Sequence, residues 1–137
     1  MSATDPLSAS DYRALARFRY ALRVFLRFSE DAARATGLTP AQHQLLLAVK
    51  GWDGSGPPTI GDLAQRLQLR NHSTVELVQR AAAADLVRTV ADEQDGRRQL
   101  VGLTPSGETV LASLSLQHRD ELRRFRTEMT DILDELA

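Results

Sequence analysis

Polar side chains between residues 70 and 80 have hydrogen-bonding chemistry that suits nucleic acids. Apolar Val75, Val78 and Ala82 are expected to form the inward face of a helix, which leaves six polar side chains outside it: Arg70, Asn71, His72, Glu76, Gln79 and Arg80. Arginine suits the edge of guanine, asparagine and glutamine suit adenine, and glutamate accepts from cytosine. Ser73 and Thr74 fall in the first turn, where free N–H groups and the helix dipole favour a phosphate. The segment is therefore predicted to contact bases and phosphates.

Two of these side chains have other interpretations. Glu76 lies four residues before Arg80, and an ion pair along the helix is the stronger expectation for it. His72 is expected to be a polar residue near the helix start or a phosphate contact, because its sequence neighbours offer no second metal ligand. His43, His72 and His118 show no short ligand spacing, so no metal site is predicted.

Composition excludes several other classes of function. The chain of 137 residues has no cysteine, which removes disulfides, thiol chemistry and cysteine-bound zinc. No nucleophile with a nearby base and no carboxylate pair appears at a usable spacing, so the chain is not expected to be an enzyme or to need a cofactor. No stretch approaches the roughly 18 apolar residues of a membrane span, and Met1–Asp11 lacks the features of a signal peptide. We expect no membrane contact and a cytoplasmic location.

The elements that must position the polar residues are mostly helices. The first is predicted over Asp11–Ala35, capped by Ser8 or Ser10 and stopped by Gly37. Three further helices follow: one from Pro40 to about Trp52 capped by Thr39, one of about eight residues capped by Thr59, and one over His72–Ala84 capped by Asn71 or Ser73. The last two are short and separated by a tight turn, which predicts a helix-turn-helix.

A hairpin and a returning helical region complete the pattern. Residues 86–90 and 99–103 have strand composition, and the polar segment 91–98 between them contains the turn residues Asp95-Gly96. Thr104 and Pro105 reopen a helix, and a last segment carries apolar residues at helical spacing. The predicted fold is mainly α with a small β-hairpin wing: a winged helix-turn-helix flanked by N- and C-terminal helices.

The ordered motifs resemble the MarR family of transcription regulators over nearly the whole chain. The resemblance is carried by Leu63–Leu67, by Arg70–Arg80 and, most specifically, by Asp95-x-Arg97 followed by Val101-x-Leu103-Thr104-x-x-Gly107. It implies one MarR-type domain over 1–137, with a winged helix-turn-helix at 38–104 and dimerisation helices at 8–36 and 105–137. It further implies a homodimer on a pseudo-palindromic DNA operator, usually repressing nearby genes and released by a small aromatic ligand.

The hairpin tip has a pattern that suits the minor groove of DNA. Asp95 and Arg97 lie two residues apart, so the carboxylate can fix the guanidinium before it enters the narrow groove, and Arg98 can take a phosphate. The matching arginine of the family enters that groove, and this role is carried over to Arg97. The alternative is a salt-bridged wing that faces solvent and binds nothing.

Two apolar stripes on the terminal helices are candidates for dimerisation. They consist of Leu15, Phe18, Leu22 and Phe25, and of Leu122, Phe125, Met129 and Leu133. The alternative is that both stripes cover the core of a monomer, because a helical stripe does not distinguish burial within a chain from burial between chains. His43 and Trp52 are candidates for an effector pocket, with a core histidine and a buried tryptophan as the alternative.

Two features weaken the DNA-binding interpretation. Between Thr59 and Thr104, six arginines face six acidic residues, which is meagre for contact with phosphates. Relatives usually have glycine where this chain has Asp85, and the Ala81–Ala84 run replaces larger residues, which puts the orientation of the reading helix in doubt. The competing function is a degenerate winged-helix dimer that binds proteins and not DNA.

Overall fold

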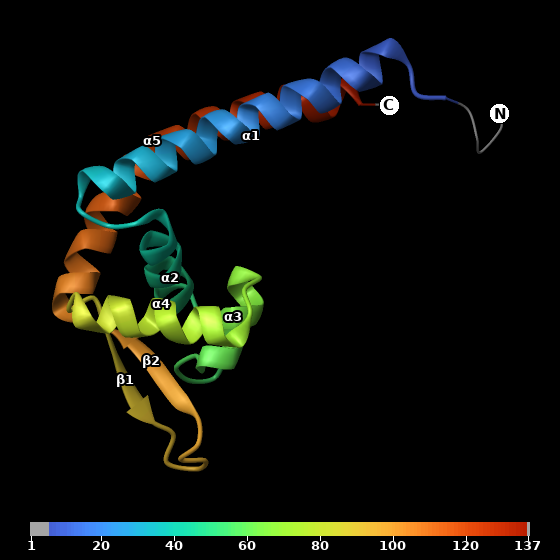
Figure 1. Cartoon of the computed structure of the whole chain (residues 1–137). Coiled ribbons are helices and arrows are strands. Elements are labelled where there is room, and N and C mark those ends of the chain that lie inside the picture. Colours follow the sequence, from blue (N-terminus) through green and yellow to red (C-terminus); the bar gives the residue numbers. More distant parts are fainter. Residues whose placement is uncertain (1–5, 137) are drawn as a thin grey trace. The chain divides into compact units, whose positions relative to one another are not determined.

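The computed structural model describes residues 6–136, which form two compact units (Figure 1). Met1–Asp5, part of the segment in which no signal peptide is expected, and Ala137 lie outside the described residues. One unit spans residues 33–115, and the other joins residues 6–32 to residues 116–136. No helix within residues 6–136 is long and apolar enough to cross a membrane.

The first unit is a winged helix. Its elements are α2 (Pro40–Lys50), α3 (Ile60–Leu67), α4 (Asn71–Ala83), β1 (Val87–Ala91), β2 (Gln99–Leu103) and the first third of α5 (Pro105–Glu135). The strands are antiparallel, with Val87 opposite Leu103 and Ala91 opposite Gln99. On the other edge of β2, the Val101 N–H donates to the Pro58 carbonyl oxygen at 3.0 Å. The predicted mainly α fold with a hairpin wing is confirmed.

The helices of this unit begin where their capping residues predict. Thr39 and Gln42 form a reciprocal capping box before α2, and Thr59 and Asp62 form another before α3. The Thr104 hydroxyl oxygen accepts from the Gly107 N–H at 3.0 Å at the start of α5. These three caps are confirmed.

The start of α4 differs from the prediction. Arg70 is its N-cap residue, with an extended backbone, and no side chain caps the helix. Asn71 is already helical, so the prediction that Asn71 or Ser73 caps this helix is wrong. No side chain caps the helix because its N-cap residue is an arginine, whose side chain has no hydrogen-bond acceptor, while the Thr74 hydroxyl donates to the Arg70 carbonyl oxygen at 2.9 Å.

The core of the winged helix lies where α2, α3, α4 and the hairpin meet. Its largest fully buried side chains include Leu45, Leu46, Leu63, Val78 and Val101. Since α4 packs against α2, α3 and β1, its exposed face is held by a rigid interior.

The second unit is a helical hairpin, formed by α1 (Ala9–Ala35) and the C-terminal part of α5, which lie side by side (Figure 1). Ser8 caps α1, since its hydroxyl oxygen accepts from the Asp11 N–H at 3.1 Å. The α1 helix ends at Ala35, and Gly37, which the sequence predicts to stop it, has a φ of 87°. The sequence suggests two segments after Pro105, but α5 is one helix, because no glycine or proline follows its first turn.

Candidate nucleic-acid interface

The exposed face of α4 carries most of the polar residues that the sequence singles out. Arg70, Asn71, His72, Glu76, Gln79 and Arg80 are exposed, and Ser73 is half-buried. The inward face is turned by about one residue from the predicted one: Thr74, Val78 and Ala81 are buried, whereas Val75 is half-buried and Ala82 is exposed. Hydrogen-bond donors and acceptors thus share one solvent-facing surface.

Thr74 is the exception among the predicted contacts. Its exposed fraction is 0%, and its hydroxyl is used by the Arg70 carbonyl oxygen. The prediction that Thr74 contacts a DNA phosphate is therefore wrong. Threonine is apolar on one side and polar on the other, so a sequence pattern does not show which side a helix uses.

Glu76 keeps its carboxylate available on this surface. Glu76 and Arg80 are both exposed, and no ion pair joins them in the part of the chain that the structure describes. The predicted pairing along the helix is not observed. Both side chains are consequently open to a partner.

The wing tip holds its arginine in a fixed geometry. An Asp95 carboxylate oxygen accepts from the Arg97 backbone N–H and from its side-chain Nε–H, both at 3.2 Å. These hydrogen bonds hold the pKa of Asp95 below its ordinary value, first through the side chain of Arg97 and then through its backbone. The Arg97 side chain is nevertheless 92% exposed. The Asp95 carboxylate thus orients the guanidinium, and most of the Arg97 side chain remains accessible to a partner.

The second arginine of the tip, Arg98, is tied to the turn by its backbone. Its N–H donates to the Asp95 carbonyl oxygen, and its own carbonyl oxygen accepts from the Asp92 N–H, both at 2.9 Å. The Arg98 guanidinium lies 3.9 Å from the Asp92 carboxylate, and its side chain is 55% exposed. Two exposed cations therefore project from a hydrogen-bonded turn.

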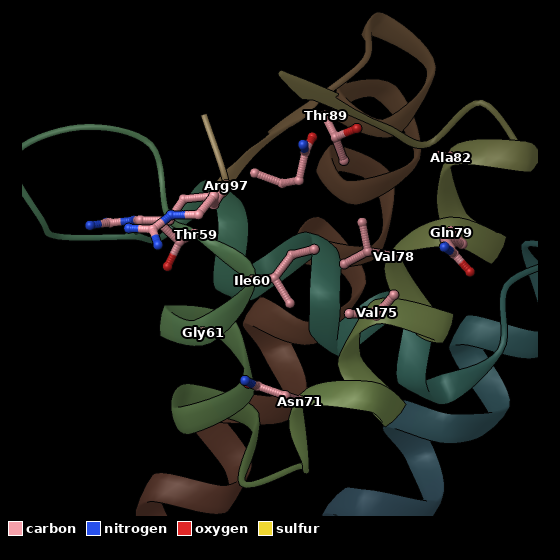
Figure 2. A pocket seen from close by; sticks show the side chains of 12 residues that line it. Thr59, Ile60, Gly61, Asn71, Val75, Val78, Gln79, Ala82, Thr89 and Arg97 are labelled. Atoms are coloured by element: carbon pink, nitrogen blue, oxygen red, sulfur yellow. The ribbon is translucent and has the colours of Figure 1, made fainter. Parts of the chain in front are cut away.

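A groove of about 740 Å³ connects α4 with the wing (Figure 2). Its lining comes from the start of α3, from α4 and from the hairpin: Thr59, Ile60, Gly61, Asn71, Val75, Val78, Gln79, Ala82, Thr89, Arg97, Arg98 and Gln99. The floor is apolar and the rim carries amide, hydroxyl and guanidinium groups. Asn71, Gln79, Arg97 and Arg98, which the sequence predicts separately, are brought to this one groove.

The sequence reasoning did not assign five of the groove residues to the site: Thr59, Ile60, Gly61, Thr89 and Gln99. Thr89 and Gln99 lie on the two strands, on the same side of the hairpin as buried Val87 and Val101 respectively. The alternation of side chains along each strand predicts which side of the β-hairpin Thr89 and Gln99 occupy. It does not predict that α4 packs against that side.

The joint between α4, the hairpin and α5 is closely packed. Asp85 adopts a left-handed backbone with φ of 60°, a conformation that favours glycine. A Cβ atom on Gly107 would lie 2.1 Å from the Leu86 carbonyl oxygen, so only glycine fits there. This close approach gives a physical reason for glycine at the end of the wing motif.

The predicted dimerisation stripes divide into two groups in the helical hairpin. Phe18, Phe125 and Met129 pack against the buried cluster of Ala14, Ala21 and Ile132 within the chain. The rings of Phe25 and Phe125 are 5.1 Å apart between centroids. All four side chains are half-buried, so the contact between α1 and α5 leaves part of each exposed, and their role in dimerisation stays a prediction.

The leucines of the same stripes are free to meet another molecule. Leu15, Leu122 and Leu133 are 41%, 48% and 60% exposed, and Leu22 is half-buried. Leu26, which the sequence reasoning missed, is also exposed and lies four residues after Leu22 on the same line of α1. An exposed apolar edge, formed by these leucines, thus runs along the helical hairpin of α1 and α5.

The predicted effector residues, His43 and Trp52, lie in different surroundings, and their role in an effector pocket stays a prediction. His43 is buried in α2, and the half-buried Trp52 ring has the Arg66 guanidinium 4.9 Å above its centroid. Neither residue lines the groove beside α4. Within residues 6–136, no group of three or more potential metal-ligating side chains is found.

Comparison with known proteins shows which family the winged helix resembles. The MarR family model matches residues 36–98, from the end of α1 to the wing tip. The transcriptional activatory protein BadR of Rhodopseudomonas palustris is 31% identical over 112 residues, which cover 74% of this chain and 64% of that protein. This chain carries a MarR-family domain. The resemblance predicted from the motifs is confirmed, and members of this family are transcription regulators and not enzymes.

Solved structures show the same MarR fold. AbsC, a MarR family transcriptional regulator from Streptomyces coelicolor, has a TM-score of 0.74 at 22% identity, with 89% of this chain and 82% of that one covered. The MepR–DNA complex of S. aureus has a TM-score of 0.64 at 21% identity, with 88% and 98% covered. The chain spans 64% of the length of BadR.

Proposed function

We propose that this protein is a sequence-specific DNA-binding transcription regulator that works as a homodimer on a pseudo-palindromic operator. The observation that carries the proposal is the groove that joins the exposed polar face of α4 to the oriented Arg97 of the wing. A helix of this kind reads base edges in the major groove, and an arginine beside it suits the adjacent minor groove. The solved complex of MepR with DNA supports this assignment.

The roles of the individual residues follow from their exposure. Gln79 and Asn71 suit adenine, and Glu76, which has no intrahelical partner in the described structure, suits cytosine. The other members of the interface are Arg70, His72, Ser73, Arg80, Asp95, Arg97 and Arg98. Arg98 and Ser73 contact DNA phosphates, and Asp95 contributes by orienting the Arg97 guanidinium.

The homodimer is proposed on the exposed apolar edge of the helical hairpin. Leu15, Leu22 and Leu26 follow one line of α1, while Leu122 and Leu133, three turns apart, follow one line of α5. Operator half-sites lie about 34–36 Å apart, so the two winged helices of a dimer need a two-fold symmetric interface that fixes the distance between them. Covering these leucines in a symmetric contact supplies such an interface.

Repression and release by a small aromatic ligand complete the proposal. BadR is named as an activator, so the direction of regulation is tested with a reporter gene under the chain's own upstream DNA, in which deletion of the regulator raises expression if it represses. Adding a panel of aromatic acids to the same assay tests release. A regulator of this kind acts on DNA in the cytoplasm.

The central experiment measures binding to the upstream intergenic DNA over a range of salt concentrations. Each neutralised phosphate adds about 0.9 to the salt slope, so four arginines in each half of a dimer give a slope of about 7. We expect a slope well above three. A flat salt response contradicts the proposal.

A matched pair of variants tests the groove directly. Arg97→Ala removes the oriented guanidinium and is expected to weaken operator binding about tenfold. Arg88→Ala is the control, since Arg88 is an exposed arginine of the same hairpin whose side chain lies on the opposite side from Thr89. Equal effects of the two substitutions contradict a specific role for the groove.

The second candidate function is a dimer that binds proteins. It is favoured by the balance of six arginines and six acidic residues between Thr59 and Thr104, which gives the winged helix little net attraction for phosphates. Operator affinity that is unchanged in Arg97→Ala favours this function over the first.

A further inference from the structure

The end of α4 is fixed more firmly than its beginning. No side chain caps its N-terminus at Arg70, and the Ala81–Ala84 run offers only small side chains near its C-terminus. At that C-terminus, the Asp85 N–H donates to the Ala82 carbonyl oxygen at 3.0 Å, and the Leu86 N–H donates to the Ala81 carbonyl oxygen at 2.9 Å. These bonds close the helix with Asp85 in the left-handed conformation.

Asp85 also binds the start of α5 with both its backbone and its side chain. Its carbonyl oxygen accepts from the Thr104 hydroxyl at 2.6 Å, and its carboxylate accepts from the Ser106 hydroxyl at 3.3 Å. The Thr104 N–H donates to the Leu86 carbonyl oxygen at 3.1 Å. One residue therefore connects the end of α4, the first strand and the first turn of α5.

The charge of Asp85 suits this place. Its carboxylate accepts from the Ser106 hydroxyl in the first turn of α5, where the helix dipole favours an anion. A left-handed backbone is unfavourable for a residue with a Cβ atom, but aspartate tolerates it better than most. The contact with Ser106 gives the side chain a use that glycine lacks.

We propose that Asp85 is a positioning residue for DNA recognition, whose carboxylate ties the end of the recognition helix α4 to Ser106 of α5. The inference rests on the proposed function, because it concerns how the α4 surface is presented to DNA. A binding constellation must be held within about 0.5 Å by supporting contacts outside the interface itself. Asp85 provides such support without touching DNA.

Three substitutions separate the parts of this role. Asp85→Gly keeps the left-handed backbone and removes the carboxylate, Ser106→Ala removes only the donor, and Asp85→Asn keeps an acceptor oxygen and a residue that tolerates this backbone. Ser113→Ala is the matched control, since Ser113 is exposed on the same helix two turns further on. Each variant is measured for operator affinity, salt slope and thermal midpoint.

We expect Asp85→Gly and Ser106→Ala to weaken operator binding about fivefold, with a thermal midpoint within about 2 °C of the parent. Asp85→Asn is expected to retain operator affinity within about twofold. The salt slope stays unchanged in all of them, because no phosphate contact is removed. Operator affinity of Asp85→Gly equal to that of the parent overturns the proposal, as does a loss in Ser113→Ala of the same size.

Amide hydrogen exchange separates failure of this inference from failure of the proposed function. If the parent protein does not bind its upstream DNA, the proposed function is wrong, but the joint is still tested by the exchange of the Leu86 and Thr104 amides. Faster exchange of both in Asp85→Gly, and not in Ser113→Ala, supports the tie between α4 and α5. Unchanged exchange overturns it.

Discussion

The winged helix and the helical hairpin specify their surfaces in different ways. In the winged helix, individual polar residues, caps and one tightly packed glycine fix where each functional side chain lies. In the hairpin, phenylalanines and alanines of a repeating apolar pattern form the interior, and the leucines beside them remain exposed. Much of the polar site can therefore be predicted residue by residue, whereas the exposed apolar edge can be identified only once the packing of α1 against α5 is known.

The largest expected effect tests how strictly the winged helix fixes its joint. Gly107→Ala places a Cβ atom 2.1 Å from the Leu86 carbonyl oxygen, so the backbone of the joint must move. We expect a loss of about 3 kcal/mol in the free energy of unfolding, measured by urea denaturation. Gly56→Ala is the control, since a Cβ atom there meets nothing within 4 Å. Similar stability of the two variants contradicts the close packing of the joint.

The next largest expected effect concerns the exposed apolar edge of the helical hairpin formed by α1 and α5. A double variant with Leu122→Glu and Leu133→Glu places charges on that edge and leaves the buried cluster intact. We expect a monomer in sedimentation and a loss of about a hundredfold in operator affinity, because two linked heads bind far more tightly than one. Leu47→Glu, on a leucine of the winged helix that is 47% exposed, serves as the control. A double variant that remains dimeric places the interface elsewhere.

A smaller effect distinguishes structural from DNA-contacting residues on α4. Thr74→Val removes a buried hydroxyl that donates to the Arg70 carbonyl oxygen, so we expect a loss of about 1 kcal/mol in unfolding free energy with little change in operator affinity. Ser73→Ala is expected to reduce operator affinity with little change in unfolding free energy, because the Ser73 side chain is half-buried at the helix surface. Reduced operator affinity in Thr74→Val at unchanged stability would restore Thr74 to the interface.

Much of the fold could be predicted because the signals are local. Thr39, Thr59 and Thr104 cap their helices through bonds that span three residues, and Asp95-Gly96 forms the hairpin tip. Such bonds depend on neighbours in the sequence and not on the rest of the molecule. The prediction for the start of α4 failed because the helix begins one residue earlier than expected, with Arg70 as its N-cap.

The rest of the site could not be predicted because it depends on packing between elements. The sequence predicts the inner face of α4 from its apolar residues, but the helix is turned so that Ala81 is buried and Ala82 is exposed. Alanine is compatible with both positions. The same limit applies to Phe18 and Leu15, which belong to one predicted stripe and yet differ in burial once α5 packs on α1.

The smallest effect concerns the electrostatics of the wing tip. The Arg97 side chain and backbone hold the pKa of Asp95 below its ordinary value, so the carboxylate stays ionised and keeps orienting Arg97 throughout the neutral and mildly acidic range. This orientation is lost only as the pH falls through the lowered pKa, and we expect no change in operator affinity from this group between about pH 5 and 8. A carboxyl NMR titration measures this interaction: in Arg97→Ala the pKa of Asp95 should rise toward its ordinary value. An unchanged titration midpoint would show that the Arg97 side chain does not lower the pKa of Asp95. Because the pair is exposed, the hydrogen bonds act on the direction of the guanidinium more than on stability, which is what a side chain entering a narrow groove requires.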